Sequence, residues 1–272
     1  MRILDAHFHL WRIDGPGRSW PGPDLPRLHR DFTADDLRLE TAGLDVAGGI
    51  LVQSQADDRD TDWLLAIDDP LVRGVVGWTD LAAPGAPQRI ASLAAQPALK
   101  GLRPMLQSIA DTDWIMAPAL EPAIEAMIVH GLRFDALIQP RHLGVLHAFA
   151  TRWPDLPIVI DHAAKPHAAT GTLDPWRDGI AALATLPNVW CKLSGLRTEQ
   201  APEQPAAALA PYVSHLVTSF GDRLMWGSDW PVLVDTGDAY RDWVRATIDL
   251  VGPVDLDRLF SGAASAFYGV PV

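Results

Sequence analysis

Two histidines near the start of the chain have the spacing of side chains on one face of a strand. They lie in the segment Asp5-Ala6-His7-Phe8-His9. Because successive side chains of a strand point to opposite faces, His7 and His9 share a face and Phe8 takes the other. Two imidazoles so placed could serve a reacting centre, or they could be hydrogen-bonded core residues. The pair alone does not distinguish catalysis from structure.

A carboxylate and a third histidine lie at the ends of two later apolar runs. Asp229 closely precedes Pro231, which stops the last run, and His162 ends the sixth. Three imidazoles and one carboxylate suit a borderline divalent ion such as zinc. Such an ion keeps a position open for water and lowers the pKa of that water to about 7. The residues that we predict as catalytic groups and as metal ligands are His7, His9, His162 and Asp229.

Donors at neighbouring strand ends could bind the oxygens of a substrate. Arg103 lies at the end of the fourth apolar run and Lys192 at the end of the seventh, and both side chains bind oxygen ligands. Lys165 follows shortly after His162. A buried salt bridge would also explain Arg103 and Lys192, and a solvated position would explain Lys165. Their shared location at strand ends favours substrate binding.

Aromatic residues and the remaining histidines carry weaker signals. The chain has 11 tryptophans, and an aromatic wall is one way to bind a sugar ring. Most of them are better explained as seals between loops and the core, but Trp230, beside Asp229, is expected at the site. The other histidines fit surface or capping roles, with His29 and His142 kept as candidates for the mouth of the site.

Eight apolar runs of strand length must position these residues. They are rich in Val, Ile and Leu and lack strict alternation, which is typical of strands buried on both faces. Segments of helical spacing separate them, one of them opening at the capping residue Thr33 and another covering residues 117–130. The eight runs cover residues 2–9, 47–55, 72–81, 100–106, 132–139, 157–164, 189–195 and 224–229.

The alternation of strands and helices predicts a single (β/α)8 TIM barrel over residues 1–272. An open nucleotide-binding sheet is less favoured, because no glycine-rich turn follows the first strand. Barrel enzymes carry their chemistry at the carboxyl ends of the strands. The long segment 11–31, rich in proline and glycine, follows the first strand on that face. We expect it to cover the site.

Composition narrows the function classes. The formal net charge is −12 and basic residues do not cluster, so nucleic acid is not an expected partner. No apolar run approaches the length of a membrane span and no signal-peptide core follows Met1, which predicts a cytoplasmic protein. Cys191 is the only cysteine, so any metal must be held by histidine and carboxylate.

Taken in order, the motifs resemble the amidohydrolase superfamily of the amidohydrolase 2 type. The similarity is to its sugar-acid lactonase branch, which includes L-fuconolactonases, L-rhamnonolactonases and pyrone-dicarboxylate lactonases. The resemblance implies that the counterparts of the four predicted centre residues surround the reaction and that the counterpart of Arg103 contacts substrate. Gln53 joins the substrate-binding candidates by its position on the second strand. The motifs lie at residues 5–11, 51–53, 74–78, 101–107, 140–143, 161–162, 165–166, 192–195 and 227–231.

Three departures from the wider superfamily argue against a binuclear metal site. Phe8 replaces the usual glutamine between the first histidines, the fifth strand lacks a histidine in residues 134–138, and no lysine occupies a bridging position on the fourth strand. The family also includes lactonases that use no metal. One divalent ion, with zinc as the first choice, is therefore expected, and metal-free catalysis stays open.

The resulting hypothesis is hydrolysis of a sugar-acid lactone such as L-fuconolactone or L-rhamnonolactone. Asp229 would activate water, while His162, Arg103 or a metal would stabilise the oxyanion. Three alternatives stay open: a nonoxidative decarboxylase of the same superfamily, a lactonase for 2-pyrone-4,6-dicarboxylate, and a noncatalytic binding protein. The sequence leaves the substrate and any homo-oligomer undetermined. The residues predicted to bind substrate are Arg103, Gln53, Lys192, Lys165, Trp230 and His142.

Overall fold

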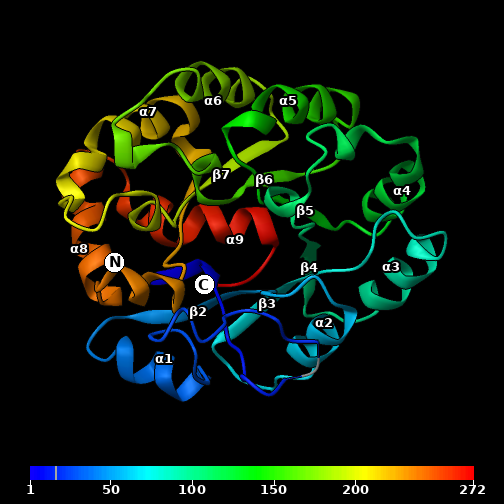
Figure 1. Cartoon of the computed structure of the whole chain (residues 1–272), viewed down its shortest axis with the longest axis horizontal. Coiled ribbons are helices and arrows are strands. Elements are labelled where there is room, and N and C mark those ends of the chain that lie inside the picture. The colour runs from blue at the N-terminus through cyan, green and yellow to red at the C-terminus, as the bar shows by residue number, and fades with distance from the viewer. Residues whose placement is uncertain (16) are drawn as a thin grey trace.

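The computed structural model describes residues 1–15 and 17–272, and it shows a single (β/α)8 TIM barrel (Figure 1). The eight strands are parallel and follow chain order around the sheet. The predicted fold class is confirmed. The strands are β1 (Ile3–Phe8), β2 (Val46–Val52), β3 (Val72–Gly77), β4 (Leu99–Leu102), β5 (Arg133–Ala136), β6 (Ile158–Ile160), β7 (Val189–Leu193) and β8 (Leu224–Trp226).

The helices that precede the last strand lie outside the sheet, between consecutive strands (Figure 1). The predicted cap at Thr33 is present: the Thr33 hydroxyl accepts from the Asp36 N–H, and the Asp36 carboxylate accepts from the Thr33 N–H. The helices are α1 (Ala34–Glu40), α2 (Asp58–Leu65), α3 (Ala86–Ala94), α4 (Glu121–Val129), α5 (Leu143–Arg152), α6 (Trp176–Ala184), α7 (Ala210–Phe220), α8 (Tyr240–Val251) and α9 (Ala263–Tyr268).

The barrel closes where the first strand meets the chain that follows the last. The Asp229 N–H donates to the His7 carbonyl over 2.8 Å, and the His9 N–H donates to the Trp230 carbonyl over 2.7 Å. Phe8 and Trp230 form a parallel bridge. The backbone of the predicted centre is therefore part of the seam of the barrel.

Helix α9 closes the opposite end of the barrel. Arg133, the first residue of β5, donates from Nε to the Phe267 carbonyl over 2.7 Å, which places α9 at the amino-terminal ends of the strands. In Figure 1 this helix crosses the middle of the molecule. It packs against interior side chains such as Leu4, Ile50 and Met225. Helix α9 thus fills the amino-terminal end of the barrel, and the predicted site lies at the carboxyl end.

All eight predicted runs extend past the carboxyl ends of the observed strands, by one to four residues, and two of them show why. The sixth run was expected to continue to residue 164, but β6 ends at Ile160, and the eighth was expected to reach Asp229, but β8 ends at Trp226. The reason is backbone conformation: residues 162–165 and Asp229 all have positive φ angles, which no strand contains. Residues 11–31 form the predicted irregular segment after β1, with residue 16 outside the described residues. Within residues 1–15 and 17–272, no helix has the length and hydropathy required to cross a bilayer.

Candidate active site

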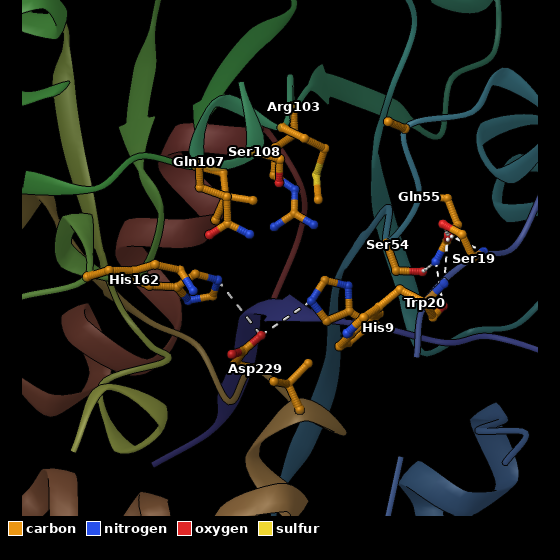
Figure 2. Close-up of a pocket in the computed structure, with 15 residues that line it drawn as sticks. His9, Ser19, Trp20, Ser54, Gln55, Arg103, Gln107, Ser108, His162 and Asp229 are labelled. Atoms are coloured by element: carbon orange, nitrogen blue, oxygen red, sulfur yellow. Dashed lines mark hydrogen bonds and ion pairs between the residues drawn. The ribbon is translucent and has the colours of Figure 1, made fainter. Parts of the chain in front are cut away.

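Three side chains meet at the carboxyl end of the barrel seam. His7 Nε2 lies 3.2 Å from His9 Nε2, and the Asp229 Oδ1 atom lies 3.7 Å from the first nitrogen and 3.3 Å from the second. All three residues are buried. Figure 2 shows Asp229 between His9 and His162, with a dashed line drawn to each. The predicted convergence of His7, His9 and Asp229 is therefore present.

An irregularity in β1 turns both histidines inwards. The register between β1 and β2 shifts between Asp5 and Phe8, as expected at a β-bulge, which re-aims side chains next to many sites. The Asp5 carboxylate accepts the His7 N–H over 3.0 Å and the Ser228 N–H over 2.9 Å. Burial raises the pKa of Asp5 to about 6, although these hydrogen bonds oppose the rise. Asp5 thereby ties the two strands that carry the centre.

The donor set fits a single divalent metal ion. His9 Nδ1 lies 2.7 Å from the Val52 carbonyl, which can only accept, so Nδ1 carries the hydrogen and Nε2 presents its lone pair. His9 Nε2 faces a carboxylate oxygen of Asp229 at 3.3 Å, and a divalent ion between these two atoms would be bound by both. Tetrahedral ligands with bonds of 2.0–2.2 Å lie about 3.3–3.6 Å apart, close to the observed separations. Three protein ligands leave a fourth position open, as in catalytic sites.

His162 lies beside this group rather than within it. Its Nε2 atom is 3.9 Å from Asp229 Oδ1, but the ligand atoms of His7, His9 and Asp229 form one group, and His162 belongs to another with His7 and Asp161. Burial lowers the pKa of His162 to about 4, so the ring is neutral at pH 7. It can donate or accept a hydrogen bond next to the open position. Of the four predicted metal ligands, three thus form one group and His162 lies beside it.

A left-handed turn presents His162 to the cavity. Residues 162–165 have φ angles of 50° to 61°, although none is glycine. The left-handed region of backbone conformation costs residues other than glycine roughly 1–2 kcal/mol each. Contacts with neighbouring residues must therefore stabilise the turn. Trp176 Nε1 donates to the Ala163 carbonyl over 2.7 Å, and the Ser194 hydroxyl lies 3.0 Å from His162 Nδ1. Gly195 leaves room for the ring, because a Cβ there would lie 2.4 Å from His162 Nδ1.

Asp229 is ionised. Burial favours the neutral acid, but the imidazoles of His162, His9 and His7 outweigh burial and hold the pKa of Asp229 well below its usual range. Its backbone also has a positive φ, of 56°. A buried carboxylate with this environment can bind a cation or accept a proton from water.

Arg103 reaches the cavity from the end of β4. Its guanidinium lies 3.3 Å from Asp161 Oδ2 and 3.4 Å from His7 Nε2, and it also donates to the Gln53 carbonyl. The Gln53 amide donates in return to the Arg103 carbonyl over 2.9 Å. Gln53 therefore fixes Arg103, and Arg103 is the member of the pair that lines the cavity.

The cavity itself has a volume of about 370 Å³ and opens above the centre. Its wall combines hydrogen-bonding side chains with a few apolar ones. Figure 2 shows His162 and Gln107 on one side, and Ser54, Gln55 and Trp20 on the other. The lining residues are His9, Ser19, Trp20, Ser54, Gln55, Ala56, Arg103, Met105, Gln107, Ser108, Leu137, His162, Lys165, Asp229 and Val232.

Four predicted substrate-binding residues lie away from this wall. Lys192 is fully buried between Asp135 and Asp161, which is the salt-bridge alternative left open by the sequence. The other three are packed or used in hydrogen bonds within the protein. Lys165 does line the cavity, 3.3 Å from Glu199. The residues of the described chain that were predicted to bind substrate but do not line the cavity are Gln53, Lys192, His142 and Trp230.

Several wall residues were missed. Trp20, rather than Trp230, is the tryptophan of the cavity, and it comes from the long segment after β1. Gln107 belongs to the motif after β4 but was not singled out. Gln55 sits two residues beyond Gln53, so the strand-end rule could have found it. Nothing in local spacing signals Ser19 or Trp20, because their position depends on contacts made by a loop.

Comparison with known proteins places the chain among hydrolases. A family model described as amidohydrolase matches residues 4–270. An L-fucono-1,5-lactonase of Burkholderia ambifaria is 45% identical over 98% of this chain and 95% of its own length. An L-fucono-1,5-lactonase of Burkholderia multivorans is 30% identical over 98% and 96%. The crystal structure of a B. multivorans amidohydrolase with bound Zn matches with a TM-score of 0.91 and 30% identity over 100% of both chains.

Proposed function

Because the chain belongs to the amidohydrolase family, we propose that it is a lactonase that opens the ring ester of a sugar acid. The observation that carries the proposal is a centre of His7, His9 and Asp229 under a cavity of about 370 Å³. The 45% identity to an L-fucono-1,5-lactonase makes L-fucono-1,5-lactone the first substrate to test.

The wall of the cavity suits a small polyhydroxylated ring. Hydroxyl and amide groups on two sides can exchange hydrogen bonds with ring hydroxyls, and the indole of Trp20 offers an apolar surface. Arg103 is a buried lining residue and can bind the carbonyl oxygen of the ester. The polar side chains that can bind substrate hydroxyls are Ser19, Ser54, Gln55, Gln107 and Ser108.

Each residue of the centre has a role in the hydrolysis. Asp229 accepts a proton from the attacking water and returns it to the ring oxygen as the ester bond breaks. The Arg103 guanidinium, with neutral His162 as a donor, stabilises the charge that develops on the carbonyl oxygen. A divalent ion, zinc in this proposal, would be held by His7, His9 and Asp229 and would lower the pKa of water and polarise the ester.

The test is proton release on a panel of lactones. L-fucono-, L-rhamnono- and D-galactono-lactones and 2-pyrone-4,6-dicarboxylate are incubated with the enzyme as isolated, after chelation, and after zinc is restored. We expect turnover of a 6-deoxy sugar lactone, loss after chelation and recovery with zinc. Turnover that survives chelation would remove the metal from the mechanism. If the zinc-loaded enzyme releases no protons with any lactone of the panel, the lactonase proposal is overturned.

A further inference from the structure

A chain of buried charges lies beneath the centre. The Lys192 ammonium is 2.6 Å from Asp135 Oδ2 and 2.9 Å from Asp161 Oδ1. The side chains of all three residues are 0% exposed. Lys192 therefore cannot reach a substrate in the cavity. It lies inside the barrel, where it bridges a carboxylate of β5 and a carboxylate that follows β6.

The upper end of the chain contacts the centre. One oxygen of Asp161 lies 3.4 Å from His7 Nδ1, and the other lies 3.3 Å from the Arg103 guanidinium. Lys192 Nζ is itself 3.2 Å from His7 Nδ1. The ring of His7 is thus confined from the side opposite to Asp229. A carboxylate behind the second ring nitrogen is the usual device that orients a metal-ligating histidine.

The lower end of the chain reaches the helix that closes the barrel. The Tyr268 hydroxyl, on α9, donates to Asp135 Oδ2 over 2.7 Å. Tyr268 is buried, and its ring packs against Phe267. A continuous path of side-chain contacts therefore runs from α9, through Asp135, Lys192 and Asp161, to His7.

Stability alone is a poor explanation for this arrangement. The desolvation of buried ion pairs offsets most of their attraction, and apolar replacements of equal volume are often neutral or stabilising. Here two carboxylates, Asp135 and Asp161, face two cations, Lys192 and Arg103, so the charges balance. The balanced set holds Asp161 in one position. What that position determines is the orientation of His7.

We propose that Lys192 is a positioning residue that, anchored by Asp135 and Tyr268, holds Asp161 against His7 and so directs His7 Nε2 towards His9 and Asp229. Lys192 acts on the centre without touching substrate. The inference rests on the proposed function for its kinetic readout, whereas metal binding tests it without any substrate.

The decisive variant removes one charge of each sign. Asp135→Asn combined with Lys192→Met keeps the Asp161–Arg103 pair and leaves the charge balanced, so folding is preserved better than in Lys192→Met alone. Apoprotein is titrated with Zn²⁺ against a chromophoric chelator, and Co²⁺ absorption reports the ligand geometry. We expect zinc affinity and kcat to fall about 10- to 100-fold, the range for such supporting residues, with KM nearly unchanged.

Two further variants separate positioning from general damage. Tyr268→Phe removes only the hydroxyl and should lower zinc affinity less, in the same direction. Thr247→Val is the matched control, because it removes a buried hydrogen bond from Trp226 to the Thr247 hydroxyl, outside the charge chain. It should leave zinc affinity and kcat unchanged. Circular dichroism and urea unfolding confirm that every variant folds.

The outcomes distinguish this proposal from the proposed function. Weaker zinc binding in the double variant supports positioning even if no lactone is turned over. Equal zinc affinity and an unchanged Co²⁺ spectrum in folded double variant and parent would overturn it, as would failure of the parent to bind zinc. A loss in Thr247→Val as large as that in the double variant would also overturn it.

Discussion

The two sides of the cavity are built differently. One side consists of strand ends, where His7, His9 and Asp229 are fixed by backbone hydrogen bonds of the barrel seam. The other side includes Ser19 and Trp20, which belong to the long segment after β1 and whose backbone groups are hydrogen-bonded to the Gln55 side chain. The difference indicates that the barrel strands position the catalytic residues, whereas the long segment after β1 shapes the wall that binds substrate.

The Gln55 amide and the Arg18 guanidinium fasten the loop to the segment after β2. Gln55 donates from Nε2 to the Trp20 carbonyl over 2.7 Å and accepts the Ser19 N–H over 3.0 Å. The Arg18 guanidinium lies 3.0 Å from Asp60 Oδ1, with both side chains almost fully buried. These contacts join the segment after β1 to the segment after β2. Removing them should loosen one side of the cavity and leave the other intact.

The largest effect is expected on the strand side. Asp229→Asn removes the proton acceptor and one metal ligand without changing size, so kcat should fall between about 10²- and 10⁴-fold, the range of general acid–base catalysis. Initial rates of proton release on L-fucono-1,5-lactone measure it. A variant that keeps a tenth of the parent kcat would show that Asp229 is not the base.

A smaller loss should follow from Gly195→Ala. The new Cβ would lie 2.4 Å from His162 Nδ1, and Gly195 has a φ of 60°, so the His162 ring must move. Displacement of a catalytic group by about 1 Å can cost roughly 10²-fold in rate. Steady-state kinetics measure kcat, and Gly171→Ala is the control, since that glycine also has a positive φ but no neighbour within 4 Å. Equal losses in the two variants would assign the effect to backbone strain.

On the loop side, Gln55→Ala should change binding more than chemistry. Each hydrogen bond to the loop contributes about 0.5–1.5 kcal/mol, so the loss of two corresponds to a KM increase of about tenfold, with kcat within about twofold of the parent. Hydrogen exchange should accelerate at Ser19 and Trp20 and stay unchanged in β1. A kcat loss as large as that of Gly195→Ala would contradict the division between the two sides.

The smallest effect concerns the rigidity of the strand side. Cys191 lies on β7 with no exposed surface, and burial raises the pKa of its thiol far above the usual value. A maleimide reagent at pH 7 should therefore leave the folded enzyme unlabelled and fully active, and should react in urea. Rapid labelling of the native protein, followed by mass spectrometry, would show that this side opens readily.

The sequence predicts most of what local rules control. Apolar runs locate the eight strands, and the strand-end rule brings His7, His9, His162, Arg103 and Asp229 to one face. The strand-end rule fails where contacts between residues distant in sequence determine the position of a side chain. Lys192 and Arg103 have equivalent signals, yet one is enclosed by two carboxylates and the other reaches the cavity. Whether a strand-end cation meets substrate depends on its partners across the barrel, and no spacing records them.

The left-handed turn and the tryptophans show the same limit. Residues 162–164 belong to a predicted apolar strand, but they have positive φ angles that depend on contacts with distant residues such as Trp176 and Ser194. Trp230 is adjacent in sequence to Asp229, yet its ring packs edge-on against Phe32, with 5.4 Å between the ring centroids. Trp20 is far away in sequence and lines the cavity.

The barrel seam also determines when activity can arise during synthesis. His7 and His9 are synthesised before the other seven strands, whereas Asp229 and the hydrogen bonds that close the barrel come after all eight. A chain that ends before β8 contains His7 and His9 but lacks Asp229, so it cannot be active. Two fragments divided at an exposed loop could recover activity only by assembling. Because the seam joins the two ends of the strand order, activity requires that the whole barrel has formed.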